Sequence, residues 1–374
     1  MALGLGIFMI AEVNMVYSHY TNLIGMLVCV VTAVCCKWRF KERNKENNVL
    51  LYLLVCVFVS CMADSLAVWA DGRAGDFWRI VVYLSNTWMF IACIMNGFLW
   101  ILFIEEHIKG KNSDVHVKIL QTIIIVSLLI LVINMYLPIV FAVNGNNVYE
   151  RKPLFFLYMV IQLGFMFDAI TMYMIAKYKM GGLSVYQIWL YIMPLFVGMV
   201  AQLLVYGTSL IWPSAAVSTA VLFWQFGKED RYKDSVTRLF RYDYLPVLNE
   251  KLKKFARKQY TVIVIQVLGL PNVRNTFGMK EEDNARLEVA NIFNRTIKPK
   301  GVIVQCEGDA FAIVLNEVAD DMPQKSIKKL EKEFEEFNKL KKMEYALTVS
   351  FGQGVVDLNN GSIADVVEEL RETL

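Results

Sequence analysis

Residues 301–316, GVIVQCEGDAFAIVLN, predict two strands joined by a tight turn. Apolar residues dominate 302–306 and 310–315, and the tripeptide 307–309, Glu-Gly-Asp, separates them. Glycine beside an acidic residue at such a point is typical of a β-hairpin. By itself, this pattern indicates a soluble hairpin with an acidic turn and nothing more.

The segments on both sides of this hairpin predict an α/β fold. An apolar strand is expected at 260–268, followed by a turn at Gly278 and a helix over about 281–296. A charged helix over about 322–340 and a strand at 345–354 are expected after the hairpin. Strands that alternate with helices form a layered α/β domain. We therefore expect a sheet with the hairpin at its centre and helices on both faces.

The order of these elements, together with several short motifs, resembles the GGDEF domain, which is the fold of diguanylate cyclases. The family's signature turn, G-G-(D/E)-E-F, falls on Glu307, Gly308, Asp309, Ala310 and Phe311, and three of these five positions fit. The motifs D-x-L-T-G-L, N-D-x-Y-G-H and G-D fall on 243–248, 274–279 and 282–283, and V-S-x-G is matched by 349–352. The resemblance covers the C-terminal third of the chain.

This resemblance implies an enzyme in which two GTP molecules, one on each domain of a homodimer, become cyclic di-GMP. Each 3′-hydroxyl attacks the α-phosphate of the other GTP, and Mg²⁺ or Mn²⁺ held by carboxylates neutralises the charge. The family takes one carboxylate from the hairpin turn, where this chain has Asp309. It takes the others from the strand before the hairpin, where this chain has Gln266 and Leu268. The resemblance thus leaves Asp309 as the candidate metal ligand, and Gln266 replaces a ligand.

Other positions also lack the residues that the family uses to bind nucleotide. The guanine-recognising Asn and the Asp after it fall on Arg274 and Asn275, which leaves Asn275 and Asp283 as candidates for nucleotide binding. Glu307 replaces the first turn glycine, and its carboxylate would repel a triphosphate. The family's closing A-D-x-A-L-Y-x-A-K segment, with its phosphate-binding lysine, is not found before Leu374. We therefore expect a degenerate, catalytically inactive domain, in which Asp309 serves as a turn residue rather than a metal ligand.

The N-terminal part of the chain has the composition of a membrane protein. The whole chain is 56% hydrophobic, with a mean hydropathy of +0.42. Only 25 charged residues precede position 227, whereas 48 follow from Gly227 onward. Seven apolar runs approach the ~20 residues that cross a bilayer; they are 20–36, 49–70, 78–103, 119–143, 153–175, 184–205 and 209–226. Residues 1–17 either extend the first span, lie at the interface or form a poor span.

Loop charges predict the orientation of these spans. The loops after the first, third and fifth spans carry ten Lys and Arg residues, and the alternate loops carry four. Because basic residues favour the cytoplasmic side, the N-terminus is expected outside and residues 227–374 inside a bacterial-type inner membrane. The three expected parts are a sensor at 1–226, a helical linker at 227–242 and a GGDEF-like domain at 243–374.

Several classes of site are disfavoured by the sequence. The C-terminal part has 24 basic and 24 acidic residues and no basic stripe with interleaved aromatics, so nucleic acid is not an expected partner. The seven cysteines lack zinc-ligand spacing, and the three histidines lie near predicted membrane edges. Asp64 and Asp168 lie within apolar runs, where acids are costly. Each is therefore a candidate either for a ligand pocket or for a polar contact between helices.

The leading hypothesis is a membrane-bound signalling protein whose sensor reads a small ligand, a lipid or the state of the bilayer. Its degenerate GGDEF-like domain would act by binding a guanine nucleotide or a protein, with a homodimer as the expected assembly. One alternative is an active diguanylate cyclase that uses GTP and Mg²⁺ or Mn²⁺. Another is a transporter or channel with a cytoplasmic accessory domain, although no repeat between halves supports it.

Overall fold

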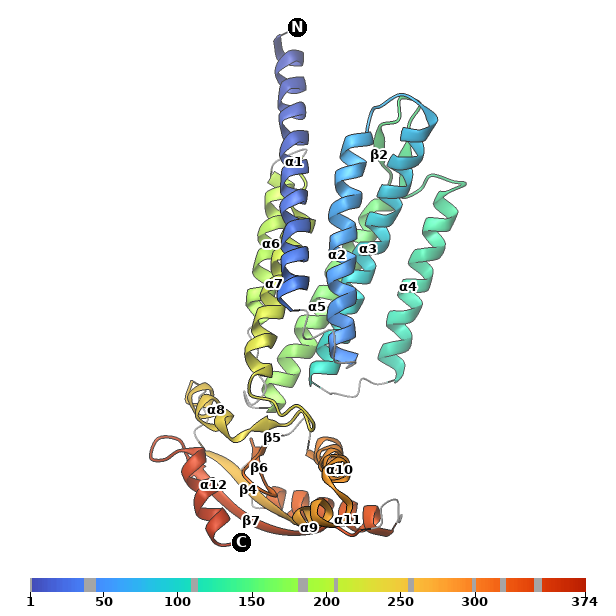
Figure 1. Ribbon diagram of the computed structural model, residues 1–374. Helices are drawn as coiled ribbons and strands as arrows, with labels where there is room; N and C mark the ends of the chain where they lie inside the picture. The colour runs from blue at the N-terminus through green and yellow to red at the C-terminus, as the bar shows by residue number, and fades with distance from the viewer. Residues whose placement is uncertain are drawn as a thin grey trace. The chain divides into compact units, whose positions relative to one another are not determined.

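A computed structural model of the chain is shown in Figure 1. The structure describes residues 2–36, 45–108, 114–180, 188–204, 208–254, 259–297, 301–316, 321–339 and 345–374. The chain divides into two compact units, and apart from two short segments the first ends at Gly227 and the second begins at Lys228. This boundary lies where the density of charged residues in the sequence changes.

The first unit is a bundle of long helices (Figure 1). They are α1 (Ala2–Cys35), α2 (Lys45–Ala70), α3 (Asp76–Ile108), α4 (Asp114–Asn134), α5 (Phe155–Met180), α6 (Ile188–Leu204) and α7 (Ile211–Asp230). In the described part of the chain, five segments are long and apolar enough to cross a membrane, one in each of α1 to α5. The apolar part of α6, Trp189–Gln202, is shorter. Residues from Ala2 onward belong to the same helix as the first predicted span.

The predicted span 119–143 is wrong at its C-terminal end, because α4 ends at Asn134. The Asn134 side chain accepts hydrogen bonds from the backbone N–H groups of Val140 (2.7 Å) and Phe141 (3.3 Å), and so holds a reversal of the chain. Pro138 lies inside this reversal, and a proline disfavours helix in the residue before it. A short hairpin that the sequence analysis did not predict follows, made of β1 (Phe141–Val143) and β2 (Tyr149–Arg151).

The linker at 227–242 is also not the continuous helix that we expected. Helix α7 ends at Asp230, and the chain then turns back on itself. Asp234 Oδ1 accepts hydrogen bonds from the N–H groups of Val236 (3.1 Å) and Thr237 (2.8 Å), and Arg238 has a φ of 57°. Asp and Asn stabilise such turns by bonding to the backbone two residues on. This local bond competes successfully with continuation of the helix.

The second unit is an α/β domain. Its elements are β3 (Phe240–Arg241), a 3₁₀ turn (Tyr242–Tyr244), α8 (Leu245–Leu252), β4 (Gln259–Leu268), α9 (Leu270–Phe277), α10 (Met279–Ile297), β5 (Gly301–Gln305), β6 (Ala310–Leu315), α11 (Asp321–Lys339), β7 (Thr348–Asp357) and α12 (Ile363–Glu372). The sheet order is β3-β5-β6-β4-β7, with β3 parallel to β5 and the other neighbours antiparallel. The predicted hairpin therefore contributes the central strand, β6, and its neighbour β5.

Helices cover both faces of this sheet, as the sequence predicted. One face buries the alternate residues Ile263, Ile265 and Val267 of β4 against α9, α10 and α11. The other face buries Val262 and Val264, and α12 packs on it next to α8. Period-two alternation sends neighbouring side chains to opposite faces, so a strand that is apolar at every position is buried on both.

Helix α12 was not predicted from the sequence. A capping box defines its start, because Ser362 Oγ accepts from the Asp365 N–H and the Asp365 carboxylate accepts from the Ser362 N–H. Val366 and Leu370 of α12 lie against Gly354 of β7, where an added Cβ would come within 3.2 Å of the Val366 side chain. The contact is close because β7 has glycine there.

Replacing Phe293 by alanine is expected to lower the free energy of unfolding of the second unit by about 3–5 kcal/mol, because it leaves a cavity in the core. The Phe293 ring is fully buried and lies 5.1 Å from that of Phe311 and 5.9 Å from that of Phe334. Urea unfolding of residues 228–374, followed by circular dichroism, measures the loss. The matched control is Leu287→Ala on the same helix, which is 42% exposed and should change stability by less than about 0.5 kcal/mol. Equal losses in the two variants would contradict this description of the core.

Candidate functional site

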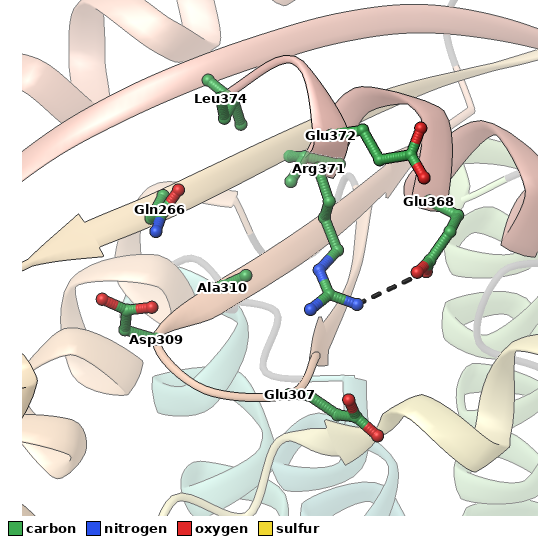
Figure 2. Close-up of a pocket in the computed structure, with 9 residues that line it drawn as sticks. Gln266, Glu307, Asp309, Ala310, Glu368, Arg371, Glu372 and Leu374 are labelled. Carbon is green, nitrogen blue, oxygen red and sulfur yellow. Dashed lines mark hydrogen bonds and ion pairs between the residues drawn. The ribbon is translucent and has the colours of Figure 1, made fainter.

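An open cleft of about 210 Å³ lies where β4, the β5–β6 turn and α12 meet. The side chains that line it are Val264, Gln266, Glu307, Asp309, Ala310, Glu368, Arg371, Glu372 and Leu374. Figure 2 shows the two turn acids, Gln266 and the α12 side chains around this space. The cleft therefore joins the acidic turn singled out in the sequence to a helix that the sequence analysis missed.

The turn is built by its own backbone. The Cys306 N–H donates to the Ala310 carbonyl at 2.9 Å, and Gly308 has a φ of 73°, which glycine adopts without strain. The Val267 N–H donates to the Asp309 carbonyl at 2.9 Å and fixes the turn to the end of β4. These bonds hold Asp309 at the mouth of the cleft and leave its carboxylate half-buried.

Gln266 is the β4 residue closest in register to the turn. It is paired with Ala310, the residue after Asp309, and both Gln266 and Asp309 line the cleft. Leu268, two residues further along β4, is 46% exposed and is not among the lining residues. The strand thus brings a neutral amide, and no carboxylate, to the side of Asp309.

Arg371 is the one basic residue among those that line this cleft, and it was not identified from the sequence. Its Nη1 lies 3.3 Å from Glu368 Oε2, one helical turn earlier on α12 (Figure 2). The Ser-Ile-Ala-Asp pattern of the capping box at 362–365 is the signal that would have revealed the helix and so its cleft-facing side. Four carboxylates, on Glu307, Asp309, Glu368 and Glu372, surround the single guanidinium.

The donor atoms beside Asp309 differ from the set of carboxylates that the resemblance implies for a diguanylate cyclase. A divalent ion at a phosphoryl-transfer site prefers one or two carboxylates together with substrate phosphates. Asp309 supplies one carboxylate, and the neighbouring strand supplies only the Gln266 amide. Across the described residues, no group of three or more His, Cys, Asp or Glu side chains is placed to hold a metal ion. The strand next to the turn therefore adds no carboxylate to that of Asp309.

The predicted nucleotide-binding residues lie apart from the cleft lining. Asn275 is exposed on α9, and Asp283 is half-buried on α10. Between them Glu282, 5% exposed, lies 2.7 Å from Arg286 and 3.6 Å from Arg274. By the resemblance, Arg274 falls on the position of the family's guanine-recognising Asn, and Glu282 engages it. The surface at which the resemblance expected a base is thus occupied by an ion-pair triad.

Cys306, beside the turn, is expected to be chemically inert in the folded domain. Burial raises the pKa of its thiol to about 12, with Arg371 acting in the opposite direction. At pH 8 its alkylation by iodoacetamide should be on the order of 1000-fold slower in folded residues 228–374 than in urea, because the thiolate is the nucleophile. Cys306 is the only cysteine in that fragment, so mass spectrometry reads the rate directly. Equal rates in the two conditions would show that the thiol is exposed.

The two aspartates of the apolar runs, Asp64 and Asp168, are paired differently. Asp168 Oδ2 of α5 lies 3.0 Å from His116 Nε2 of α4, and both side chains are partly exposed. Asp64 of α2 is 5% exposed and is bonded to the neutral side chains of Asn22 and Ser209. The structure thus gives Asp168 a polar contact between helices, and it gives Asp64 a buried polar cluster.

The fold and the cleft define an α/β domain whose acidic hairpin turn opens on a solvent-accessible site. Residues 231–374 match the family model described as "Diguanylate cyclase, GGDEF domain". This part of the chain is a GGDEF domain, and the resemblance found in the sequence is confirmed. Domains of this family belong to cyclic di-GMP signalling.

Solved GGDEF domains are similar to this chain at low identity. The GGDEF domain of FimX from Pseudomonas aeruginosa is 20% identical, with 38% of this chain and 90% of that chain covered and a TM-score of 0.33. The coiled coil and GGDEF domain of DgcB from Caulobacter crescentus, solved with c-di-GMP, is 17% identical over 43% and 86%, with a TM-score of 0.35. Diguanylate cyclase SiaD from Pseudomonas aeruginosa, solved with its activator SiaC, is 14% identical over 59% and 85%, with a TM-score of 0.37. The comparison with curated proteins gave no match.

Proposed function

We propose that this protein is a membrane-bound signalling protein whose GGDEF domain is catalytically inactive and acts by binding a protein. Residues 1–226 form its membrane sensor, with the N-terminus outside and the GGDEF domain in the cytoplasm of a bacterial-type cell. The domain works as a homodimer or with a partner protein. Lipid and a small ligand are the partners of the sensor.

The observation that carries this proposal is the composition of the cleft. Gln266 lies where a second carboxylate is needed beside Asp309, so the charge of a metal ion is not balanced there. Three further carboxylates and one guanidinium line the remaining surface, which disfavours a triphosphate and suits a basic peptide surface. Position 274 carries an arginine that is held in an ion-pair triad with Glu282 and Arg286, so it offers no side-chain amide to a guanine base.

Nucleotide binding is the second form of output, and Arg371 is the residue that favours it. A guanidinium beside a hairpin turn is suited to bidentate phosphate contacts. The acidic surroundings of Arg371 are the reason why we rank nucleotide output below protein binding.

A binding experiment separates these outputs. Equilibrium dialysis of the purified protein with GTP and with cyclic di-GMP is expected to give dissociation constants above about 1 mM, because the cleft carries excess negative charge. Micromolar binding that is lost in Arg371→Ala would establish nucleotide output instead. The matched control is Lys332→Ala, which removes a cation from the exposed surface of α11, where the side chain is 75% exposed.

A further inference from the structure

A buried polar cluster in the first unit joins three segments that are distant in the sequence. Asp64 lies in α2, Asn22 lies in α1, and Ser209 precedes α7. Asn22 Nδ2 donates to Asp64 Oδ2 at 2.8 Å, and Ser209 Oγ donates to the same oxygen. The exposed fractions of these residues are 5% for Asp64, 0% for Asn22 and 6% for Ser209. The cluster is therefore enclosed by the helices of the bundle.

Further bonds fix the position of Ser209 in this cluster. Its N–H donates to Ser18 Oγ at 3.1 Å, and its carbonyl accepts from Thr21 Oγ1 at 3.1 Å. Gln202 Oε1 accepts from the N–H groups of Leu210 (2.9 Å) and Ile211 (3.0 Å). The non-helical segment before α7 is thus held to α1 on one side and to α6 on the other. Non-helical backbone among membrane helices is tolerated where it is buried in protein or lines a cavity.

Among the described residues, no basic side chain balances the charge of Asp64. In the described part of the chain, Asp64 has no Lys, Arg or His within ion-pair distance, and its hydrogen-bond donors are neutral. The nearby titratable groups are the thiols of Cys61 and Cys93 and the ring of His19, which is bonded to Ser65 Oγ at 2.7 Å. Two donors on one carboxylate oxygen suit the ionised form, and an isolated ionised carboxylate in an apolar bundle is costly.

A second observation points to a ligand at the same place. Asn22 Oδ1 has no hydrogen-bond partner, although the residue is fully buried and its amide is bonded to Asp64. A buried acceptor without a donor costs about 1–3 kcal/mol. A proton on Asp64 would neutralise the carboxylate but would leave this amide oxygen unpaired. A cation that contacts both oxygens would satisfy the charge and the acceptor together.

We propose that Asp64, Asn22 and Ser209 form a binding site for one monovalent cation, with Na⁺ as the test ion. The ligands are the Asp64 carboxylate, the Asn22 amide oxygen and the Ser209 hydroxyl oxygen. One carboxylate balances one monovalent charge, whereas a divalent ion would leave a net positive charge in the bundle. Because the site ties α1 and α2 to the start of α7, cation occupancy would stabilise one packing of these helices. This proposal names the ligand of the sensor and so rests on the proposed function.

Thermal unfolding of the full-length protein in nanodiscs tests the site. At constant ionic strength, replacing choline chloride by NaCl should raise the unfolding midpoint by about 5 °C, since a ligand that binds only the folded state stabilises it. Binding of ²²Na⁺ should reach one ion per chain. Asp64→Asn should abolish both effects, and Ser209→Ala should weaken ²²Na⁺ binding about tenfold. The control Asp76→Asn removes the same charge at an exposed position and should leave both unchanged.

Different results would overturn the cation site and the membrane-bound function. A midpoint that is the same in NaCl and choline chloride, or that depends on pH alone, would overturn the cation site. An equal response to NaCl in wild-type protein and Asp64→Asn would also overturn it. If Asp64→Asn does not fold, loss of ²²Na⁺ binding in folded Ser209→Ala supports the proposal, and unchanged binding contradicts it. Release of the protein from membranes by carbonate without detergent would instead refute the membrane-bound function.

Discussion

The purified protein, incubated with GTP and Mg²⁺ or Mn²⁺, is expected to form no cyclic di-GMP above background. The turn offers Asp309 as the candidate metal ligand, and the neighbouring strand β4 adds only the neutral amide of Gln266. Losing one group that stabilises the charge of a transition state typically costs 10²–10³ in rate, and here several are replaced. Chromatography of the nucleotides after incubation, with the protein dimerised through a fused coiled coil, measures the product.

Gln266→Asp alone should not restore product formation. The substitution would place a second carboxylate next to Asp309, but Glu307 still carries a negative charge at the turn. Position 274 also keeps an arginine, which pairs with Glu282, where the family has an asparagine amide that recognises guanine. The matched control is Asp309→Ala, which should behave like the wild-type protein in the same assay. Robust product formation that disappears in Asp309→Ala would overturn the inactive assignment and establish the active cyclase.

Reporter fusions after Lys45, Gly145 and Leu374 are expected to read cytoplasm, outside and cytoplasm. Ten basic residues in one set of loops against four in the other set the direction. The effect is all-or-none, because each fusion point lies on one side of the bilayer. A reporter that is active outside the cell when fused after Leu374 would refute the cytoplasmic position of the GGDEF domain.

A fusion after Thr208, between α6 and α7, tests the number of spans. Helix α6 has 17 residues, which is about 25 Å of helix, against a hydrocarbon core of about 30 Å. Five and seven spans both leave Leu374 on the same side, so only the position between α6 and α7 distinguishes them. An outside reading at Thr208 supports seven spans, and a cytoplasmic reading limits the crossing helices to α1–α5.

Local patterns in the sequence were sufficient for several elements of the GGDEF domain, although not for α12. Strand β4 was expected at 260–268 and occupies Gln259–Leu268, and helix α10 was expected at about 281–296 and occupies Met279–Ile297. Alternation, helical periodicity and turn residues act over a few positions, so they can be read without knowledge of the fold. The same patterns failed at 135–143 and at 231–239, where an Asn or Asp side chain bonded to the backbone outweighs apolar composition or helix continuation.

The sequence by itself determined the α/β class of the C-terminal part, the acidic turn at 307–309 and the apolar character of the chain before 227. Only the tertiary structure decided which groups share a site. It brings Arg371 of α12 to the same cleft as Gln266 and Asp309, and it joins Asp64 to Asn22 and Ser209. The physical reason is that hydrogen bonding within an element depends on neighbours a few residues away, whereas a site depends on side chains that packing brings together from distant parts of the chain.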